Sequence, residues 1–338
     1  MRGEEAGKYP GWFSRLSTFG TPDRGRAIGQ ILDTFIPYIL LWVGMVYTLR
    51  AGYSYGVTLL LSVIAALFLI RIFIIFHDCT HSSFWPNRRI NTLIGYVSGI
   101  LTFTPFWDWG RSHAKHHMTV GNLDRRGTGD VWMLTVEEYR AASKGKKFLY
   151  RFYRNPFVMF FLWPIFIFLL SNRLPTPGAG KKEKRSVWIT NGAILGIILV
   201  ASFTLGLKTY VLIQLPTIWI AGIMGVWLFY VQHNFVPGYW AREGEWDRIK
   251  ASLEGSSYYK LPRILQWFTG NIGIHHVHHM RPSIPNYKLQ ACYDSIPELQ
   301  EVKPLTLGES LQSLKLRFWD EQRRRMVGLE AIKAQKPL

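Results

Sequence analysis

The sequence predicts an all-α integral membrane protein with about four transmembrane helices, one or two re-entrant or interfacial segments, and a helical cytoplasmic cap. Three observations lead to this prediction. Hydrophobic residues make up 48% of the 338 residues, and they gather into long runs. Lysine and arginine collect between these runs, and the histidines all fall into four short motifs. Such a distribution is typical of a multi-pass membrane protein whose polar parts lie on one side.

Four apolar runs are long enough to be considered as membrane-crossing helices: residues 34–49, 57–76, 187–207 and 209–231. A crossing helix needs about 20 mostly apolar residues, so the first run, which contains Pro37, must extend back past Asp33. Arg71 lies near the end of the second run, where its long side chain can reach the interface. The runs are joined in pairs by tight connections at Arg50 and Lys208.

Two other apolar runs fit a membrane crossing less well. Residues 92–109 contain Pro105 together with two tryptophans, and residues 157–170 are short, with Pro164 in the middle. Both are expected to be interfacial or re-entrant. Residues 171–185, rich in proline, glycine and lysine, are expected to form a loop.

The distribution of charge tests this topology. If only the four long runs cross, Arg50 and Lys208 are the only basic residues outside, Arg71 lies in a span, and all others are cytoplasmic. This distribution agrees with the positive-inside rule. A fifth crossing at residues 92–109 would break the rule, because it would place the basic stretch 111–154 outside. The net charge of +18 therefore needs no nucleic-acid partner, and no nucleic-acid-binding module is recognisable.

We expect one membrane domain over residues 1–338. Residues 1–30 form a cytoplasmic N-terminal segment, 34–231 the membrane region with the first two histidine motifs, and 232–338 a cytoplasmic cap with the third. Within this cap, residues 307–336 have the apolar spacing of a helix. Both termini and all histidine motifs are expected on the cytoplasmic side.

The ten histidines have spacings that suit metal binding. They are His77 and His81 in HDCTH, His113, His116 and His117 in HAKHH, His233 in YVQHNF, and His275, His276, His278 and His279 in HHVHH. On a helix, residues at i, i+3 and i+4 share a face, so each HxxxH or HxxHH motif is expected to direct its imidazoles to one point. Nine such ligands exceed the needs of one metal. The cap is therefore predicted to carry a histidine-ligated di-metal site.

The chemistry of the ligands narrows the choice of metal. Imidazole binds iron, zinc, copper and nickel, but a zinc protease would have HExxH, and Asp78 stands where the glutamate would be. Structural zinc sites close at four ligands, and Cys79 and Cys292 are too few for an iron–sulfur cluster. Iron with dioxygen suits C–H activation of an apolar substrate beside lipid. An iron oxygenase is the prediction.

These motifs resemble those of the membrane fatty acid desaturase family, over residues 34–300. HDCTHSSF is similar to the first histidine box of acyl-lipid desaturases of the omega-6 (Δ12) and bacterial Δ5 type, whereas acyl-CoA Δ9 desaturases have a longer HxxxxH. YVQHNFVPGYWAREGEWD resembles the segment after their last span, and GNIGIHHVHHMRPSIPNYKL resembles their third box.

The resemblance implies an enzyme that uses dioxygen and two electrons to introduce a cis double bond into a fatty acyl chain, which lies in a narrow tunnel. It also implies two iron ions, held by His77, His81, His113, His116, His117, His233, His275, His278 and His279. In acyl-CoA relatives an asparagine four residues before the single histidine holds a metal-bound water, but Phe229 stands there in this chain. Gln232, Asn234 and Asn271 are candidates for that supporting role. His276, about 100° around the helix from His275, is expected to support a ligand or lie at the surface.

Two electrons must come from another protein. The chain has no dinucleotide-binding fingerprint and no cysteine cluster, and its histidines are already assigned, so a ferredoxin or cytochrome b5 is expected as the external donor. The basic residues expected on the cytoplasmic face are Arg125, Arg126, Lys144, Lys146 and Lys147. Such a face would attract an acidic carrier or anionic membrane lipids equally well.

Two other functions compete with desaturation. A hydroxylase or ketolase on the same scaffold, acting on an alkane, carotenoid or sterol, shares the metals, but the sequences around the boxes favour a desaturase. A metal transporter would place polar ligands within its spans, whereas the spans here contain no histidine. The absence of a visible C-terminal retention signal favours a bacterial inner membrane over the endoplasmic reticulum.

Overall fold

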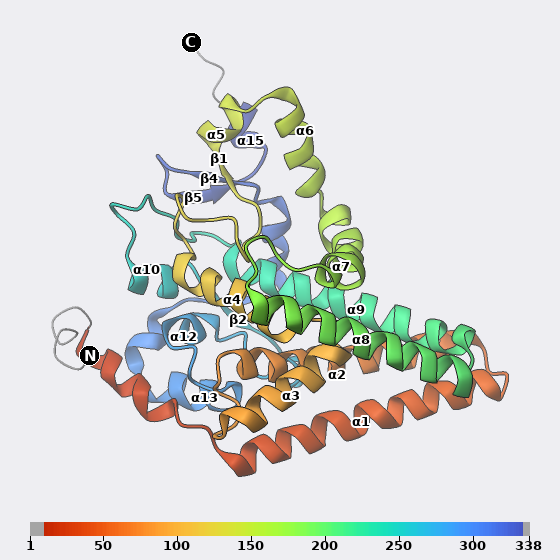
Figure 1. Ribbon diagram of the computed structural model, residues 1–338. Coiled ribbons are helices and arrows are strands. Elements are labelled where there is room, and N and C mark those ends of the chain that lie inside the picture. Colours follow the sequence, from red (N-terminus) through yellow and green to blue (C-terminus); the bar gives the residue numbers. More distant parts are fainter. Residues whose placement is uncertain (1–9, 334–338) are drawn as a thin grey trace.

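The computed structural model describes residues 10–333 and is mostly helical (Figure 1). Its four longest helices coincide with the four predicted crossing segments and are long and apolar enough to span a membrane. They are α1 (Arg24–Arg50), α2 (Tyr55–Thr80), α8 (Lys181–Thr204) and α9 (Leu207–His233). The protein is therefore a multi-pass membrane protein, as predicted.

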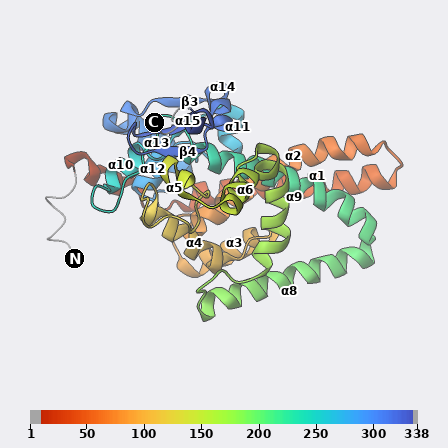
Figure 2. The same cartoon turned by 90° about the horizontal axis from the view of Figure 1, so that it is seen from above.

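The long helices form two hairpins, α1–α2 and α8–α9, whose turns point the same way, away from the cap (Figures 1 and 2). Helix α2 is central because it packs against both α1 and α9. It is also the most hydrophobic of the four and the most deeply buried. This central position brings its last turn into the middle of the protein.

Two helices begin earlier than the apolar runs suggest. Helix α1 starts after Asp23, whose side chain accepts a hydrogen bond from the Arg26 backbone N–H at 2.9 Å, and this cap stabilises a polar first turn. Helix α8 starts at Lys181, so the predicted loop 171–185 is wrong for its last five residues. In both cases a polar turn extends a helix that hydropathy alone recognises only where it becomes apolar.

The two shorter apolar runs are broken helices. The first contains the end of α3 (Arg88–Leu101) and the beginning of α4 (Phe106–Thr119); between them the chain turns at Phe103, which has a φ of 54°, and at Pro105. The second follows α6 (Lys144–Tyr153) as a helical segment, Val158–Arg173, that includes α7 (Trp163–Ile165). Together α6 and this segment form one unit bent by 62°; the part Val158–Arg173 is called the bent segment below.

The cap consists of short elements gathered at one end of the long helices (Figure 1). Its helices are α5 (Val136–Ala141), α10 (Arg248–Leu253), α11 (Arg263–Phe268), α12 (His275–Met280), α13 (Asn286–Ser295), α14 (Leu307–Ser310) and α15 (Glu330–Lys333). Its strands are β1 (Leu134–Thr135), β2 (Tyr258–Lys260), β3 (Pro304–Thr306), β4 (Phe318–Asp320) and β5 (Arg325–Val327). They form two small sheets, β1–β4–β5 and β2–β3.

The helix predicted over residues 307–336 is wrong in its central part. Strand β4 pairs in parallel with β1 and antiparallel with β5, and all three residues of β4 are buried. Phe318 and Trp319 point to opposite sides of the strand, and both sides are covered, so a one-sided helical pattern does not describe them. Residues 334–336 lie outside the described residues.

Candidate metal centre

Four helices bring the predicted histidines together. His77 lies in the last turn of α2 and His81 caps its end; α4 carries the second motif, α9 ends at His233, and α12 carries the third motif. These helices come from distant parts of the sequence and meet where the cap joins the long helices (Figure 1).

Nine of the ten histidines form two compact groups, each able to hold a metal ion. The five-histidine cluster consists of His77, His81, His113, His117 and His278. The four-histidine cluster consists of His116, His233, His275 and His279. Within each cluster the potential ligand atoms lie within 4.8 Å of one another.

The expectation that each HxxHH motif directs three imidazoles to one point is wrong. In α4, His113 and His117 belong to one cluster and His116 to the other. In α12 the division is reversed, because His278 joins the five-histidine cluster while His275 and His279 join the other. The reason is helical geometry: positions i+3 and i+4 lie about 100° apart, on either side of position i. Each motif therefore bridges two metal sites.

The distances between ring nitrogens fit metal coordination. The Nε2 atom of His233 lies 3.1 Å from that of His116 and 3.0 Å from that of His275. In the other cluster, the Nε2 atom of His117 lies 3.1 Å from that of His113 and 3.0 Å from that of His278. Nitrogens bound at right angles, about 2.1 Å from a metal, would lie about 3.0 Å apart. A central cation satisfies these converging nitrogens together, whereas neutral imidazoles, with one N–H each, cannot all satisfy one another.

Three imidazoles are oriented by acceptors on their other ring nitrogen. His77 Nδ1 donates to Asp78 Oδ1 at 3.1 Å, and His116 Nδ1 donates to Asp130 Oδ1 at 2.5 Å. His233 Nδ1 donates to the Gly255 carbonyl at 3.1 Å. A proton fixed on Nδ1 leaves the Nε2 lone pair facing the cluster, as a metal ligand requires.

Asp78 is held by a buried chain of hydrogen bonds. Its Oδ2 accepts from the Asn286 backbone N–H at 2.6 Å and from the Asn286 side-chain amide at 2.8 Å. The Asn286 Oδ1 in turn accepts from Gln30 Nε2 at 3.0 Å. This chain connects α1 and α13 to the ligand at the end of α2. Sequence reasoning missed its role, although the HD dipeptide of the first box placed a carboxylate beside a ligand.

Asp130 reaches His116 because a glycine lets its loop approach α4 closely. Gly129 has a φ of 75°, and a Cβ there would lie 2.9 Å from the Ser112 carbonyl oxygen and 3.0 Å from His116 Cβ. A side chain would therefore push the loop away from the helix. Nothing in the sequence around Asp130 marks this contact.

Burial favours the neutral form of several imidazoles in the clusters. Burial lowers the pKa of His81, His113 and His117 well below the ordinary value, and neighbouring imidazoles lower it further. Burial likewise lowers the pKa of His278 and His279. Neutral imidazole is the form that binds metal, so these five side chains are suited to coordination at neutral pH.

His276 faces away from both clusters. It is fully buried, and its Nε2 donates to the Leu299 carbonyl at 3.1 Å. Burial lowers its pKa to about 4, although the hydrogen bond to Leu299 partly opposes this. His276 is therefore a core residue, neither at the surface nor in either cluster.

The proposed substitutes for the missing asparagine have other partners. Gln232 Nε2 donates to the Ile272 carbonyl at 3.0 Å, and Asn234 Oδ1 accepts from buried Arg154 at 3.3 Å. Asn271 takes a positive φ of 57° in the turn before α12. The Phe229 ring lies 5.3 Å from the rings of both His116 and His233, so an aromatic ring rather than an amide stands beside the four-histidine cluster at this position.

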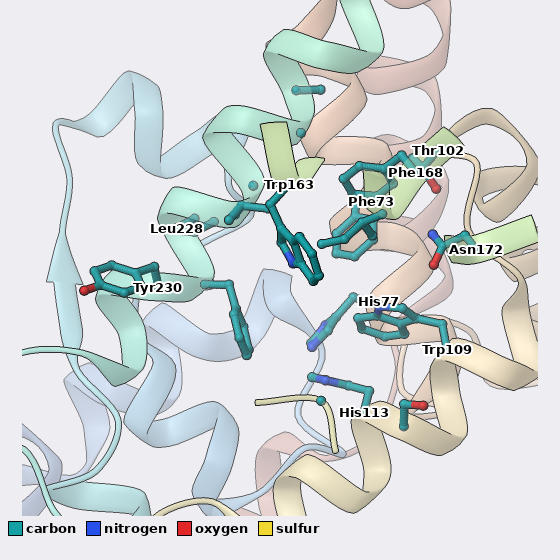
Figure 3. A pocket seen from close by; sticks show the side chains of 18 of the residues that line it. Phe73, His77, Thr102, Trp109, His113, Trp163, Phe168, Asn172, Leu228 and Tyr230 are labelled. Atoms are coloured by element: carbon teal, nitrogen blue, oxygen red, sulfur yellow. The ribbon is translucent and has the colours of Figure 1, made fainter. Parts of the chain in front are cut away.

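A cavity of about 440 Å³ runs from the clusters between α2, α9 and the bent segment. Figure 3 shows His77 and His113 on one side of it, with the rings of Phe73, Trp163 and Phe168 as apolar wall. Along α9 the lining extends from Ile218 to Gln232, about 21 Å at 1.5 Å per residue.

Comparisons with known proteins agree with this arrangement. A family model described as fatty acid desaturase matches residues 54–307. A fatty acid desaturase from Bacillus subtilis is 48% identical over 94% of this chain and 90% of its own length. An sn-1 oleoyl-lipid 12-desaturase from Synechocystis is 26% identical over 85% of this chain and 76% of its own length. An sn-1 acyl-lipid omega-3 desaturase (ferredoxin) from Nostoc is 26% identical over 73% of this chain and 67% of its own length.

Proposed function

The chain belongs to the fatty acid desaturase family, and on this premise we propose that each histidine cluster holds one iron ion and that the enzyme forms a cis double bond in an acyl chain lying in the cavity. Two hydrogens leave adjacent methylenes, and with two external electrons and two protons dioxygen is reduced to two waters. The observation that carries the proposal is that two converging imidazole clusters border one apolar cavity. The family also implies that the substrate is an acyl lipid.

Iron suits this donor set better than zinc. The five-histidine cluster offers more imidazoles than the four ligands at which structural zinc closes or the three that catalytic zinc keeps. Bound iron would supply the redox chemistry that dioxygen reduction and C–H cleavage need. The nine histidines would hold the metals, and Asp78, Asp130 and the Gly255 carbonyl would orient three of them.

The chain's own residues position the substrate and exclude water. His77, His113 and His275 line the cavity, so an acyl chain there passes both clusters. The Trp109 ring stacks on His113 with ring centres 4.4 Å apart and also lines the cavity. Apolar walls favour a hydrocarbon chain over water, and they confine the methylenes beside the metal ligands.

The clusters also constrain the membrane topology. Residues in one cluster lie on the same side of the membrane, so an even number of crossings separates them. Between His116 and His233, helices α8 and α9 already provide two, and the bent segment is therefore re-entrant. Between His81 and His113 only α3 intervenes, so it does not cross either. Four crossings, with both termini and the clusters in the cytoplasm, fit the inner membrane of a bacterium.

Iron and product analysis test the proposal together. Protein purified from iron-supplied cells should contain about two irons per chain, one for each cluster. Gas chromatography with mass spectrometry of the host's fatty acids should show a new product with an additional double bond, and its formation should require oxygen. Stoichiometric zinc with no oxygen-dependent product would contradict the proposal, and a hydroxylated or ketone product would indicate the related oxygenase chemistry instead.

A glycine in the cavity wall tests where the chain lies. A Cβ at Gly225 would meet nothing within 4 Å, since this residue faces the cavity. Gly225→Leu should therefore shorten the cavity and lower the conversion of long acyl chains by about tenfold or more. A side chain that overfills a pocket costs about 1–3 kcal/mol, and each 1.36 kcal/mol lost in the transition state lowers the rate about tenfold. Gly192→Leu on exposed α8, also free of contacts, is the matched control. Equal effects of the two substitutions would place the acyl chain elsewhere.

The topology has its own test. A reporter fused at Lys182 should read cytoplasmic, and one at Lys208 should read external. An external reading at Lys182 would mean that the bent segment crosses the membrane.

A further inference from the structure

The surface of the protein comes nearest to the metal ligands at α4. Among the nine clustered histidines only His81 and His117 are partly exposed, and both belong to the five-histidine cluster. The two residues lie side by side, with ring centres 4.8 Å apart. Electrons that enter from outside therefore have their shortest route through this cluster.

Helix α4 has two faces with opposite roles. Its histidines at positions 113, 116 and 117 point inward and contribute to both clusters. The opposite face is exposed and consists of Arg111, Ala114, Lys115 and Met118, which follow the i, i+3, i+4, i+7 spacing of one helical stripe. Met118, next to His117, is 64% exposed. One helix thus separates this stripe from both clusters.

Within residues 10–333, no carboxylate forms an ion pair with the two basic residues of the stripe. Arg111 donates to Thr176 Oγ1 at 3.2 Å and to the Pro177 carbonyl at 2.8 Å, and Lys115 Nζ donates to Thr128 Oγ1 at 2.9 Å. All of these partners are uncharged. From residue 79 to 123 the only acidic residue is Asp108, and its side chain is buried.

The basic residues first considered for a carrier are placed differently. Arg125 forms an ion pair with Glu243, and Arg126 forms one with Glu138. The lysines at 144, 146 and 147 lie on α6 beside exposed apolar residues such as Phe148, which is 72% exposed. An amphipathic helix with aromatic and basic residues suits a membrane surface, and α6 carries none of the clustered histidines.

We propose that the exposed stripe of α4 (Arg111, Ala114, Lys115 and Met118), with neighbouring Ser82, is the docking surface for an acidic, ferredoxin-type iron–sulfur protein. Thr80 lies beside Gly110 of α4, so the end of α2 continues this surface. The stripe combines two basic residues, Arg111 and Lys115, with two apolar ones, Ala114 and Met118, and a small surface of this mixed kind suits a transient redox interface. The two basic side chains attract an acidic carrier and accelerate its approach. The proposal rests on the di-iron function proposed above, and the experiment separates the two.

Charge reversal on α4 tests the surface. Iron-loaded protein in nanodiscs is mixed without oxygen with a reduced, acidic [2Fe–2S] ferredoxin, and oxidation of the ferredoxin is followed by absorbance. Lys115→Glu should slow the second-order reaction at low salt by about tenfold or more, and the difference should narrow as salt rises. Met118→Glu should slow it as well. Lys146→Glu on α6 makes the same change of net charge and should leave the rate within about twofold.

A second reductant distinguishes the possible failures. Dithionite with a small mediator bypasses the surface, so every variant should keep its iron and form product with it. If Lys115→Glu and Lys146→Glu slow the ferredoxin reaction equally, or if ferredoxin does not reduce the wild type, the docking proposal is overturned while the di-iron function stands. If the wild type lacks iron or makes no product even with dithionite, the proposed function itself fails.

Discussion

The two histidine clusters differ in number of ligands, in exposure and in what orients those ligands. The five-histidine cluster is partly exposed at His81 and His117, while all four members of the other are buried. The first is oriented through Asp78, which belongs to the same helix as the ligand it holds. The second is oriented through Asp130, from a loop, and is covered by Phe229.

This difference suggests that the two clusters tolerate the loss of one histidine unequally. A site with five ligands can lose one and keep four, whereas the four-histidine cluster would be left with three. The exposed cluster is suited to receive electrons, and the buried one is sheltered from solvent by the cap. The two sites are nevertheless coupled, because α4 and α12 each supply ligands to both.

Removal of a ligand should have the largest effect. His275→Ala leaves three imidazoles in the buried cluster, so we expect iron to fall from about two to about one per chain and product to become undetectable. His81→Ala leaves four imidazoles in the other cluster, so this variant should retain more iron than His275→Ala and should be less active than the wild type. Iron analysis and product yield measured in parallel check this. Complete loss of iron from His81→Ala would show that the fifth ligand is not redundant.

Substitution of the orienting carboxylates should have an intermediate effect. Asp130→Asn removes the charged acceptor from His116, and Asp78→Asn removes that from His77. Losses of about 10–100-fold in activity or metal affinity are typical for such partners. Asp78 also accepts two hydrogen bonds from Asn286, so Asp78→Asn should destabilise the protein more than Asp130→Asn. Thermal melting and turnover separate these effects, and the opposite order of stability would refute the role of the buried chain.

The loop that carries Asp130 allows a finer test. Gly129→Ala would place a Cβ against Ser112 and His116 and should lower turnover severalfold by moving the carboxylate. Gly127 also has a positive φ, 109°, but a Cβ there meets nothing within 4 Å. Both substitutions cost about 1–3 kcal/mol of backbone strain, so only the additional loss in Gly129→Ala reports on His116. Equal turnover in the two variants would mean that the loop position does not matter.

The sequence predicted those features that local spacing and hydropathy determine. The four long helices and the gathering of nine histidines at metal-binding sites followed from runs and motifs. The distribution of each HxxHH motif between two clusters did not, because it depends on which neighbours flank α4 and α12. Asp130 and Asn286 act through contacts between distant segments, which no local pattern encodes. The small sheet containing β4 was missed for the same reason, since Phe318 and Trp319 are covered by partners on both sides.

The smallest effect on activity is expected at His276, the histidine outside both clusters. His276→Gln should keep both irons and most turnover, because the side chain contacts the Leu299 carbonyl rather than a metal site. An amide can still donate to that carbonyl, so the packing of α12 should survive. If the variant loses iron as His278→Ala does, the division of the third motif between ligands and His276 would be incorrect.

Acid sensitivity provides a readout specific to His276. Its pKa is lowered from 6.5 to about 4 in the folded protein, so the unfolded state binds more protons between these values. The contribution of neutral His276 to the free energy of unfolding is therefore fully present above about pH 6.5. It is lost as the pH falls toward 4, by about 3 kcal/mol at most. Glutamine does not titrate. Melting of iron-loaded protein at pH 7.5 and 5 should thus show a smaller decrease for His276→Gln than for the wild type, whereas equal decreases would show that protonation of His276 does not contribute.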